Sequence, residues 1–232
     1  MQRIEINGIK IYPFTSRDEL IDYVDKNKGI LVAINARKIH SATDETRKII
    51  NNNIGYADGI AAVKVLKQKG IKNAVKIPGC ELWLDIIRKH HADKSFYLIG
   101  ATEEIINKTV SKLKTEFSDI NILGYRNGYF NSNEEKKKTI DDVIEKKPDV
   151  VFIAMGSPAQ ELLMGEMLKK HPAIYQGLGG SFKVYCGEEK RAPKWVIDHN
   201  LEGFYRFLLN PRERFQRVIK GGIFLLKLKF KK

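Results

Sequence analysis

Short hydrophobic runs alternate with charged, amphipathic stretches along most of this 232-residue chain, and this pattern restricts its possible folds most strongly. The hydrophobic runs have the length of buried strands, whereas the stretches between them have helical spacing. The runs predicted as strands are 30–35, 54–57, 74–77, 95–100, 120–125, 149–155 and 173–178. Strands that alternate with helices predict a Rossmann-like α/β domain, with a mostly parallel sheet covered by helices on both faces.

The two ends of the chain depart from this alternation. Near the start, residues 3–14 alternate around Asn7-Gly8, which predicts a β-hairpin, and Ser16 with Glu19 predicts a capped helix from Arg17 to about Lys28. Residues 191–232 contain 11 Lys/Arg and 3 Asp/Glu, a net charge of +8 out of +13 for the whole chain. We therefore predict an α/β domain over 1–190 and a basic, largely helical C-terminal appendage over 191–232.

The basic residues of the appendage are interleaved with aromatic residues and leucines. This composition favours contact with an anionic membrane surface, where apolar side chains enter the interface and Lys and Arg meet lipid phosphates. A helical pair packed on the domain with a solvated basic face is the alternative. The charge of the whole chain indicates an acidic partner, either a nucleotide phosphate, a membrane surface or a nucleic acid.

Several classes of protein lack support in this sequence. It contains no P-loop, no dinucleotide fingerprint, no nucleophile elbow and no zinc motif, so we predict neither a cofactor nor a metal. Its two cysteines, Cys80 and Cys186, have no redox or metal spacing and favour a reducing, cytoplasmic setting. No segment has the apolar length of a membrane span, and His90-His91 are expected at an exposed helix end.

Glycine and polar residues follow most of the predicted strands. In an open α/β sheet, ligands bind at the carboxyl ends of the strands. The residues found there are Asn35, Asp58-Gly59, Pro78-Gly79, Gly100, Gly156-Ser157-Pro158 and Gly179-Gly180. One glycine indicates only a turn, but their recurrence favours a ligand that carries phosphate, because backbone amides and helix N-termini bind such groups.

Asp58 and Lys76 are the charged candidates in this region. A partly desolvated carboxylate at a strand end can act as a general base, which makes Asp58 the candidate catalytic residue. The alternative is that Asp58 caps the helix that follows it. Lys76 could hold a diphosphate, or it could extend from an edge strand into solvent.

Several motifs, in order over roughly residues 30–217, resemble the WecG/TagA/CpsF family of bacterial glycosyltransferases. They are "YADGIAAVKVLKQKG", "KIPGCELW", "GYRNGYF", "VVFIAMGSPAQE", "GLGGSFKVYCGEEKRAPKW" and "LEGFYRFLLNPRERFQR". The resemblance implies an inverting, metal-independent hexosyltransferase. It would move an N-acetylhexosamine or uronic-acid sugar from a UDP-sugar to a polyprenyl-diphosphate-linked acceptor, in polysaccharide or teichoic acid synthesis on the inner face of the cell membrane.

The resemblance also implies roles for individual residues. Asp58 matches the proposed catalytic base. The substrate-binding residues by this resemblance and by the strand-end pattern are Asn35, Lys76, Gly100, Gly156, Gln160, Glu161, Arg191, Arg206, Arg214 and Arg217. The arginines would close over the site and meet the lipid diphosphate, and Gln160 would exchange hydrogen bonds with sugar hydroxyls.

The sequence departs from the family pattern at four positions: Ala33, Lys76, Glu81 and Gly203 replace the usual Thr, Arg, Asp and Trp. Ala33 keeps open a second hypothesis, a non-catalytic UDP-sugar-binding or regulatory homologue. A nucleic-acid-binding protein is the third hypothesis, which only the net charge favours. A homo-oligomeric assembly and the identity of the donor sugar are left open by the sequence.

Overall fold

The computed structural model describes residues 1–199, 204–205 and 208. Within these residues, a six-stranded sheet has the order β4-β3-β8-β7-β5-β6, and its paired strands are all parallel. Its strands are β3 (Gly29–Ile34), β4 (Ile54–Ala57), β5 (Ser95–Gly100), β6 (Asn121–Arg126), β7 (Val150–Ala154) and β8 (Ile174–Gly177). The prediction of an α/β fold with a parallel sheet is confirmed.

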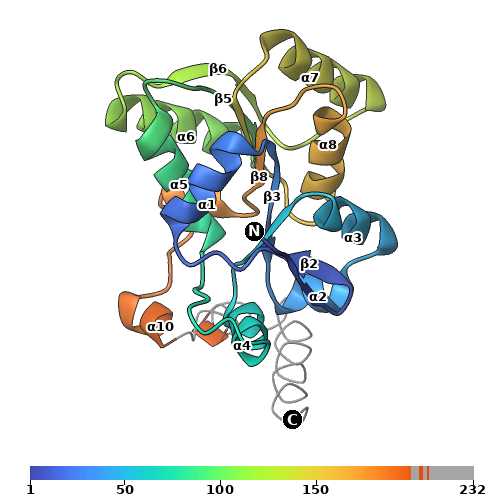
Figure 1. Cartoon of the computed structure of the whole chain (residues 1–232). Helices are drawn as coiled ribbons and strands as arrows, with labels where there is room; N and C mark the ends of the chain where they lie inside the picture. The colour runs from blue at the N-terminus through green and yellow to red at the C-terminus, as the bar shows by residue number, and fades with distance from the viewer. Residues whose placement is uncertain (200–203, 206–207, 209–232) are drawn as a thin grey trace.

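Helices cover both faces of the sheet, and Figure 1 shows α1, α5 and α6 on one side with α3, α7 and α8 on the other. The helices are α1 (Arg17–Lys26), α2 (Ala36–Ser41), α3 (Asp44–Asn51), α4 (Ile60–Gln68), α5 (Gly79–His90), α6 (Glu103–Glu116), α7 (Asn133–Lys146), α8 (Ala159–Leu168), α9 (Ser181–Tyr185) and α10 (Lys194–Asp198). One hydrophobic cluster packs α3, α4, α7 and α8 on the sheet, and a second cluster packs α1, α5, α6 and α9 on its other face. Because both faces are buried, the strands read as continuous hydrophobic runs.

The predicted hairpin is present as β1 (Ile4–Ile6) and β2 (Ile9–Ile11), which pair antiparallel. It lies beside the edge strand β4, where the amide of Tyr12 donates to the carbonyl of Gly55 over 2.8 Å. Ser16 caps α1 by accepting from the amide of Glu19 over 3.0 Å, as predicted. The helix ends at Lys26, two residues before the predicted end.

The predicted strand at 74–77 is wrong, because this segment has no regular secondary structure. Its buried residues pack in two directions: Ala74 joins one hydrophobic cluster and Ile77 the other. The amide of Ile77 donates to the carbonyl of Ala57 over 2.8 Å. The alternating pattern that resembles a strand therefore reflects an extended connection to α5, whose two buried side chains fill opposite faces.

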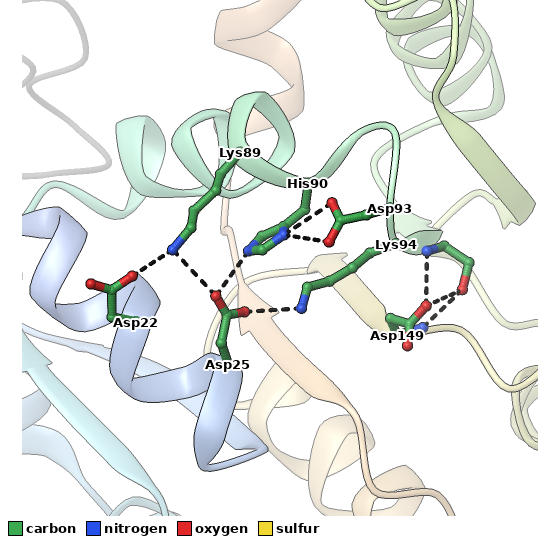
Figure 2. A network of polar contacts seen from close by, with 8 residues as sticks. Asp22, Asp25, Lys89, His90, Asp93, Lys94 and Asp149 are labelled. Atoms are coloured by element: carbon green, nitrogen blue, oxygen red, sulfur yellow. Dashed lines mark hydrogen bonds and ion pairs between the residues drawn. The ribbon is translucent and has the colours of Figure 1, made fainter.

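At the amino ends of the strands, a polar network ties α1 to the end of α5, and Figure 2 shows it centred on Asp25. Asp25 contacts Nε2 of His90 at 3.0 Å, Nζ of Lys94 at 3.1 Å and Nζ of Lys89 at 3.3 Å. The expectation of an exposed His90 is wrong, since only 6% of this residue is accessible. Asp25 of α1 contacts His90 at the end of α5, and the spacing of residues along the sequence does not indicate this contact between two helices.

Of the predicted appendage, the structure describes residues 191–199, 204–205 and 208, including α10, where Trp195 is exposed. The rest of the predicted segment lies outside the described residues. Among the helices that the structure describes, none combines the length and apolar character needed to cross a membrane.

Candidate active site

A cleft of about 650 Å³ opens at the carboxyl ends of the parallel strands. Its volume falls in the range of small-molecule sites. Each strand of the sheet sends at least one following residue to its wall: Asn35 after β3, Asp58 after β4, Ala101 after β5, Gly128 and Tyr129 after β6, Gly156 after β7, and Leu178 after β8. The cleft therefore occupies the position where doubly wound sheets bind ligands.

Asp58 follows β4 directly and reaches the cleft as a half-buried carboxylate. Its Oδ1 accepts a hydrogen bond of 2.8 Å from the amide of Gly79, the first residue of α5. An acidic side chain at a helix N-terminus is stabilised by the helix dipole and by the unpaired amides there. Gly59, not Asp58, caps α4, and it makes no side-chain capping bond. The alternative interpretation of Asp58 as the cap of α4 is wrong.

Gln160 joins two loops of the cleft wall. Its Oε1 accepts from the amide of Gly156 over 3.1 Å and from the amide of Gly179 over 3.0 Å. These amides belong to the loops that follow β7 and β8, and Gln160 itself is 3% accessible. The residue also lines the cleft. Its amide oxygen is already engaged by the backbone, a connection that the sequence did not indicate.

Glu161 lies next to Gln160 but outside the residues that line the cleft. It is 1% accessible, and its Oε1 contacts Nζ of Lys38 at 2.8 Å and accepts from the hydroxyl of Ser157 over 2.7 Å. Burial acts to raise the pKa of the Glu161 carboxyl, but the charge and hydrogen bond of Lys38, with the bonds from Ser157 and Gln160, outweigh it. The pKa therefore lies below its ordinary value. Glu161 is an ionised anchor that holds α2 against the start of α8.

The remaining predicted residues are spread more widely. Asn35 lines the cleft and caps α2, accepting from the amide of Lys38 over 3.2 Å. Gly100 ends β5 with φ +142° and lies beside the cleft residue Ala101. Lys76 is half-buried before α5 and does not belong to the cleft lining. Arg191 forms an ion pair with Glu81 in the first turn of α5. Arg206, Arg214 and Arg217 lie outside the described residues.

Sequence reasoning missed several polar residues of the cleft: Arg37, Lys38, Tyr129, Lys183 and Glu189. Three of them are cations, and Lys38 is the one that pairs with Glu161. Arg37 is exposed, and its guanidinium lies 3.5 Å from the carbonyl of Ser157 in the opposite loop. The sequence places two of these cations close to strand ends, since Arg37 follows Asn35 by two residues and Lys183 follows the Gly179-Gly180 pair by three. Both residues lie beyond the first residues after their strands, which are the positions that the strand-end rule identifies.

The cleft thus combines one carboxylate held by a helix N-terminus, two half-buried loops rich in glycine, and cations along its wall. Within the described part of the chain, no group of three or more His, Cys, Asp or Glu side chains is arranged to hold a metal ion. A model of the glycosyl transferase WecG/TagA/CpsF family matches residues 4–232. The chain belongs to this family.

Membership in the WecG/TagA/CpsF family confirms the resemblance drawn from the motifs and extends it over nearly the whole chain. The protein is therefore a glycosyltransferase, a class that uses a sugar-nucleotide donor and a glycan acceptor. The family match covers residues 191–232 as well as the residues that line the cleft.

Proposed function

We propose that this WecG/TagA/CpsF protein is an inverting, metal-independent glycosyltransferase that uses a UDP-sugar. The acceptor is a polyprenyl-diphosphate-linked glycan, the sugar is of the N-acetylhexosamine or uronic-acid type, and the product enters a cell-surface polysaccharide or teichoic acid. The observation that carries the proposal is Asp58, a carboxylate fixed by the Gly79 amide inside a cleft whose rim is cationic. A positioned base that activates the acceptor hydroxyl and cations that offset the charge of a diphosphate are two requirements of this reaction.

In the proposed mechanism, the acceptor hydroxyl attacks the anomeric carbon from the face opposite to the diphosphate. Asp58 removes the hydroxyl proton as the new glycosidic bond forms and the bond to UDP breaks. Arg37 and Lys183 offset the charge that develops on UDP, because they line the cleft whereas Lys76 does not. The arginines 206, 214 and 217 stay part of the proposal as ligands of the lipid diphosphate at the cytoplasmic membrane surface.

The test is turnover by Asp58→Asn, which keeps the size of the side chain and removes the base. We expect unchanged affinity for UDP in calorimetry and a fall in kcat of about 10²- to 10⁴-fold, the range for loss of a general base. Glu189→Gln is the matched comparison, since Glu189 is the other carboxylate that lines the cleft. Normal turnover in Asp58→Asn with a large loss in Glu189→Gln would assign the base to Glu189 instead.

A non-catalytic UDP-sugar-binding homologue is the second candidate function. It is favoured by Ala33, which lines the cleft at a position where the family pattern has a hydroxyl. A panel of UDP-sugars offered with a lipid-diphosphate acceptor separates the two functions. Binding of UDP without transfer from any donor, followed by transfer in Ala33→Thr, would support the second candidate.

A further inference from the structure

Gln176 is a buried amide in the middle of the sheet. It lies in β8 between its register partners Leu31 of β3 and Phe152 of β7, and its exposed fraction is 0%. Both neighbours belong to the apolar cluster on that face. A polar side chain costs free energy in such surroundings unless hydrogen bonds compensate it, so the partners of Gln176 indicate what it does there.

The amide group of Gln176 contacts the start of α5. Its Nε2 donates to the carbonyl of Gly79 over 3.2 Å and to the hydroxyl of Tyr56 over 3.4 Å. Its Oε1 accepts a hydrogen bond from none of the residues that the structure describes. The side chain is therefore oriented by its donor group, and this group is directed at Gly79 and Tyr56.

Gly79 connects this amide to the proposed base. Its carbonyl accepts from Gln176, and its own amide donates to Oδ1 of Asp58 over 2.8 Å. The two hydrogen bonds hold the same residue from the sheet and from the strand-end loop. A shift of the Gly79 peptide away from β8 would therefore change the bond that orients Asp58.

Tyr56 restricts the movement of Gly79 because it packs directly against this residue. A Cβ on Gly79 would lie 2.9 Å from the Tyr56 hydroxyl and 3.8 Å from Oδ1 of Asp58, so the three residues are in close contact. Burial raises the pKa of Tyr56 well above its ordinary value, and the charge of Asp58 raises it further. The Tyr56 side chain is therefore a neutral hydroxyl that acts as a rigid neighbour rather than a second base.

We propose that Gln176 is a positioning residue, which fixes the backbone of Gly79 and through it the carboxylate of Asp58. The inference rests on the proposed role of Asp58 as the base. Gln176 is fully buried and is not among the residues that line the cleft, so we expect its effect on kcat rather than on donor binding. A misplaced base slows a reaction by up to about a hundredfold even when the substrate binds normally.

The experiment compares Gln176→Met with Tyr175→Phe. Methionine keeps the volume and removes both donated hydrogen bonds. Tyr175→Phe, at the adjacent residue of the same strand, removes a partly buried hydrogen bond to the carbonyl of His171. We expect kcat to fall about 10- to 100-fold in Gln176→Met with the KM for the donor unchanged, and normal kinetics in Tyr175→Phe. Gln176→Asn, whose amide is one methylene too short to reach Gly79, serves as the second variant if the methionine variant does not fold.

Two further measurements test whether Gln176 acts on turnover through Asp58. In the Asp58→Asn background, Gln176→Met should cause no additional loss of kcat, because the group it positions is gone; an additive loss would indicate general structural damage. Amide exchange at Gly79, followed by NMR, does not depend on turnover. We expect protection in the wild type and in Tyr175→Phe, and faster exchange in Gln176→Met.

The outcomes separate this inference from the proposed function. Normal kcat and normal Gly79 exchange in both Gln176 variants would overturn the positioning role while the proposed base stands. Full turnover in Asp58→Asn would overturn the base itself, and the positioning role would fail with it. Faster Gly79 exchange together with a lowered, non-additive kcat in Gln176→Met supports the inference.

Discussion

At the scale of single residues, the cleft depends on positions that tolerate no additional atoms. Gly79 is the clearest case, because its missing side chain lets α5 begin directly against Tyr56 and present an amide to Asp58. Gln160 and Glu161 show that the environment of a side chain depends on its direction from the helix. They are adjacent in sequence, but the turn of the helix directs one to the cleft wall and the other to Lys38.

Gly79→Ala tests this close contact. Its Cβ would lie 2.9 Å from the hydroxyl of the fully buried Tyr56, so the start of α5 or the Tyr56 ring must shift, which disturbs the Gly79–Asp58 hydrogen bond. We expect the free energy of unfolding to fall by about 1–3 kcal/mol, as for other overpacked sites, and kcat to fall as well. Thermal unfolding and steady-state kinetics measure the two effects.

Gly165→Ala in the middle of α8 is the control. The nearest atom to its Cβ would be the terminal methyl group of Ile49 at 3.3 Å, which can shift. Alanine also favours a helix over glycine by up to about 1 kcal/mol. Equal loss of stability in both variants would contradict the special role of the Gly79 contact.

At the scale of elements, the glycine loops after β7 and β8 are held together by one side chain. Gln160→Ala removes the acceptor of two backbone amides, those of Gly156 and Gly179. We expect the free energy of unfolding to fall by about 1–3 kcal/mol, since partly buried donors lose their partner. The KM for the donor should rise because the two loops form one wall of the cleft.

Gln2→Ala, in the exposed segment before β1, is the matched control, and we expect its effect to stay within about 0.5 kcal/mol. Unfolding in denaturant and donor titration check both variants. A raised donor KM with unchanged stability in Gln160→Ala would favour the alternative, in which the side chain serves the sugar directly rather than the loops.

At the scale of the whole molecule, the cleft and the polar network around Asp25 lie at opposite ends of the strands. The carboxyl ends of the strands carry the cleft, whereas the Asp25 network in Figure 2 fixes α1 and α5 at the amino ends. The first residue of α5, Gly79, donates to Asp58, and its last residue, His90, belongs to this network, so the position of α5 is set from both ends. The network should therefore govern stability without entering the reaction.

The pH dependence of stability tests the network. Burial acts to raise the pKa of Asp25, but hydrogen bonds and charges from Lys94, His90 and Lys89 outweigh it, so its pKa is lowered in the folded state. A lowered carboxyl pKa contributes stability above the unfolded value, which is lost as the pH falls through the folded value. At pH 7 we expect Asp25→Asn to lose about 1–3 kcal/mol in the free energy of unfolding, and the difference from wild type to begin to shrink as the pH falls below about 4, the unfolded pKa, toward the lower folded value.

Denaturant unfolding between pH 7 and pH 3 measures this difference, with Asp141→Asn as the control. Asp141 is exposed on α7, and its replacement should change stability by less than about 0.5 kcal/mol at either pH. A constant difference between Asp25→Asn and wild type across this range would refute the electrostatic origin of the contribution.

The sequence alone determined the fold class, because strand and helix periods are set by near neighbours along the chain. It also determined that glycine and Asp58 follow the strands, and its motifs indicated the family that the family model confirmed. It failed at 74–77, where buried residues point into both clusters without pairing in the sheet.

Only the tertiary structure decided which strand-end residues share the cleft. The crossovers bring Arg37 and Lys183 to its wall, direct Arg191 to Glu81 and bury Glu161 against Lys38. They also place Gln176 beneath Gly79, across 97 positions of sequence. Such contacts join loops that are distant along the chain, and local periodicity carries no information about which loops the crossovers bring together.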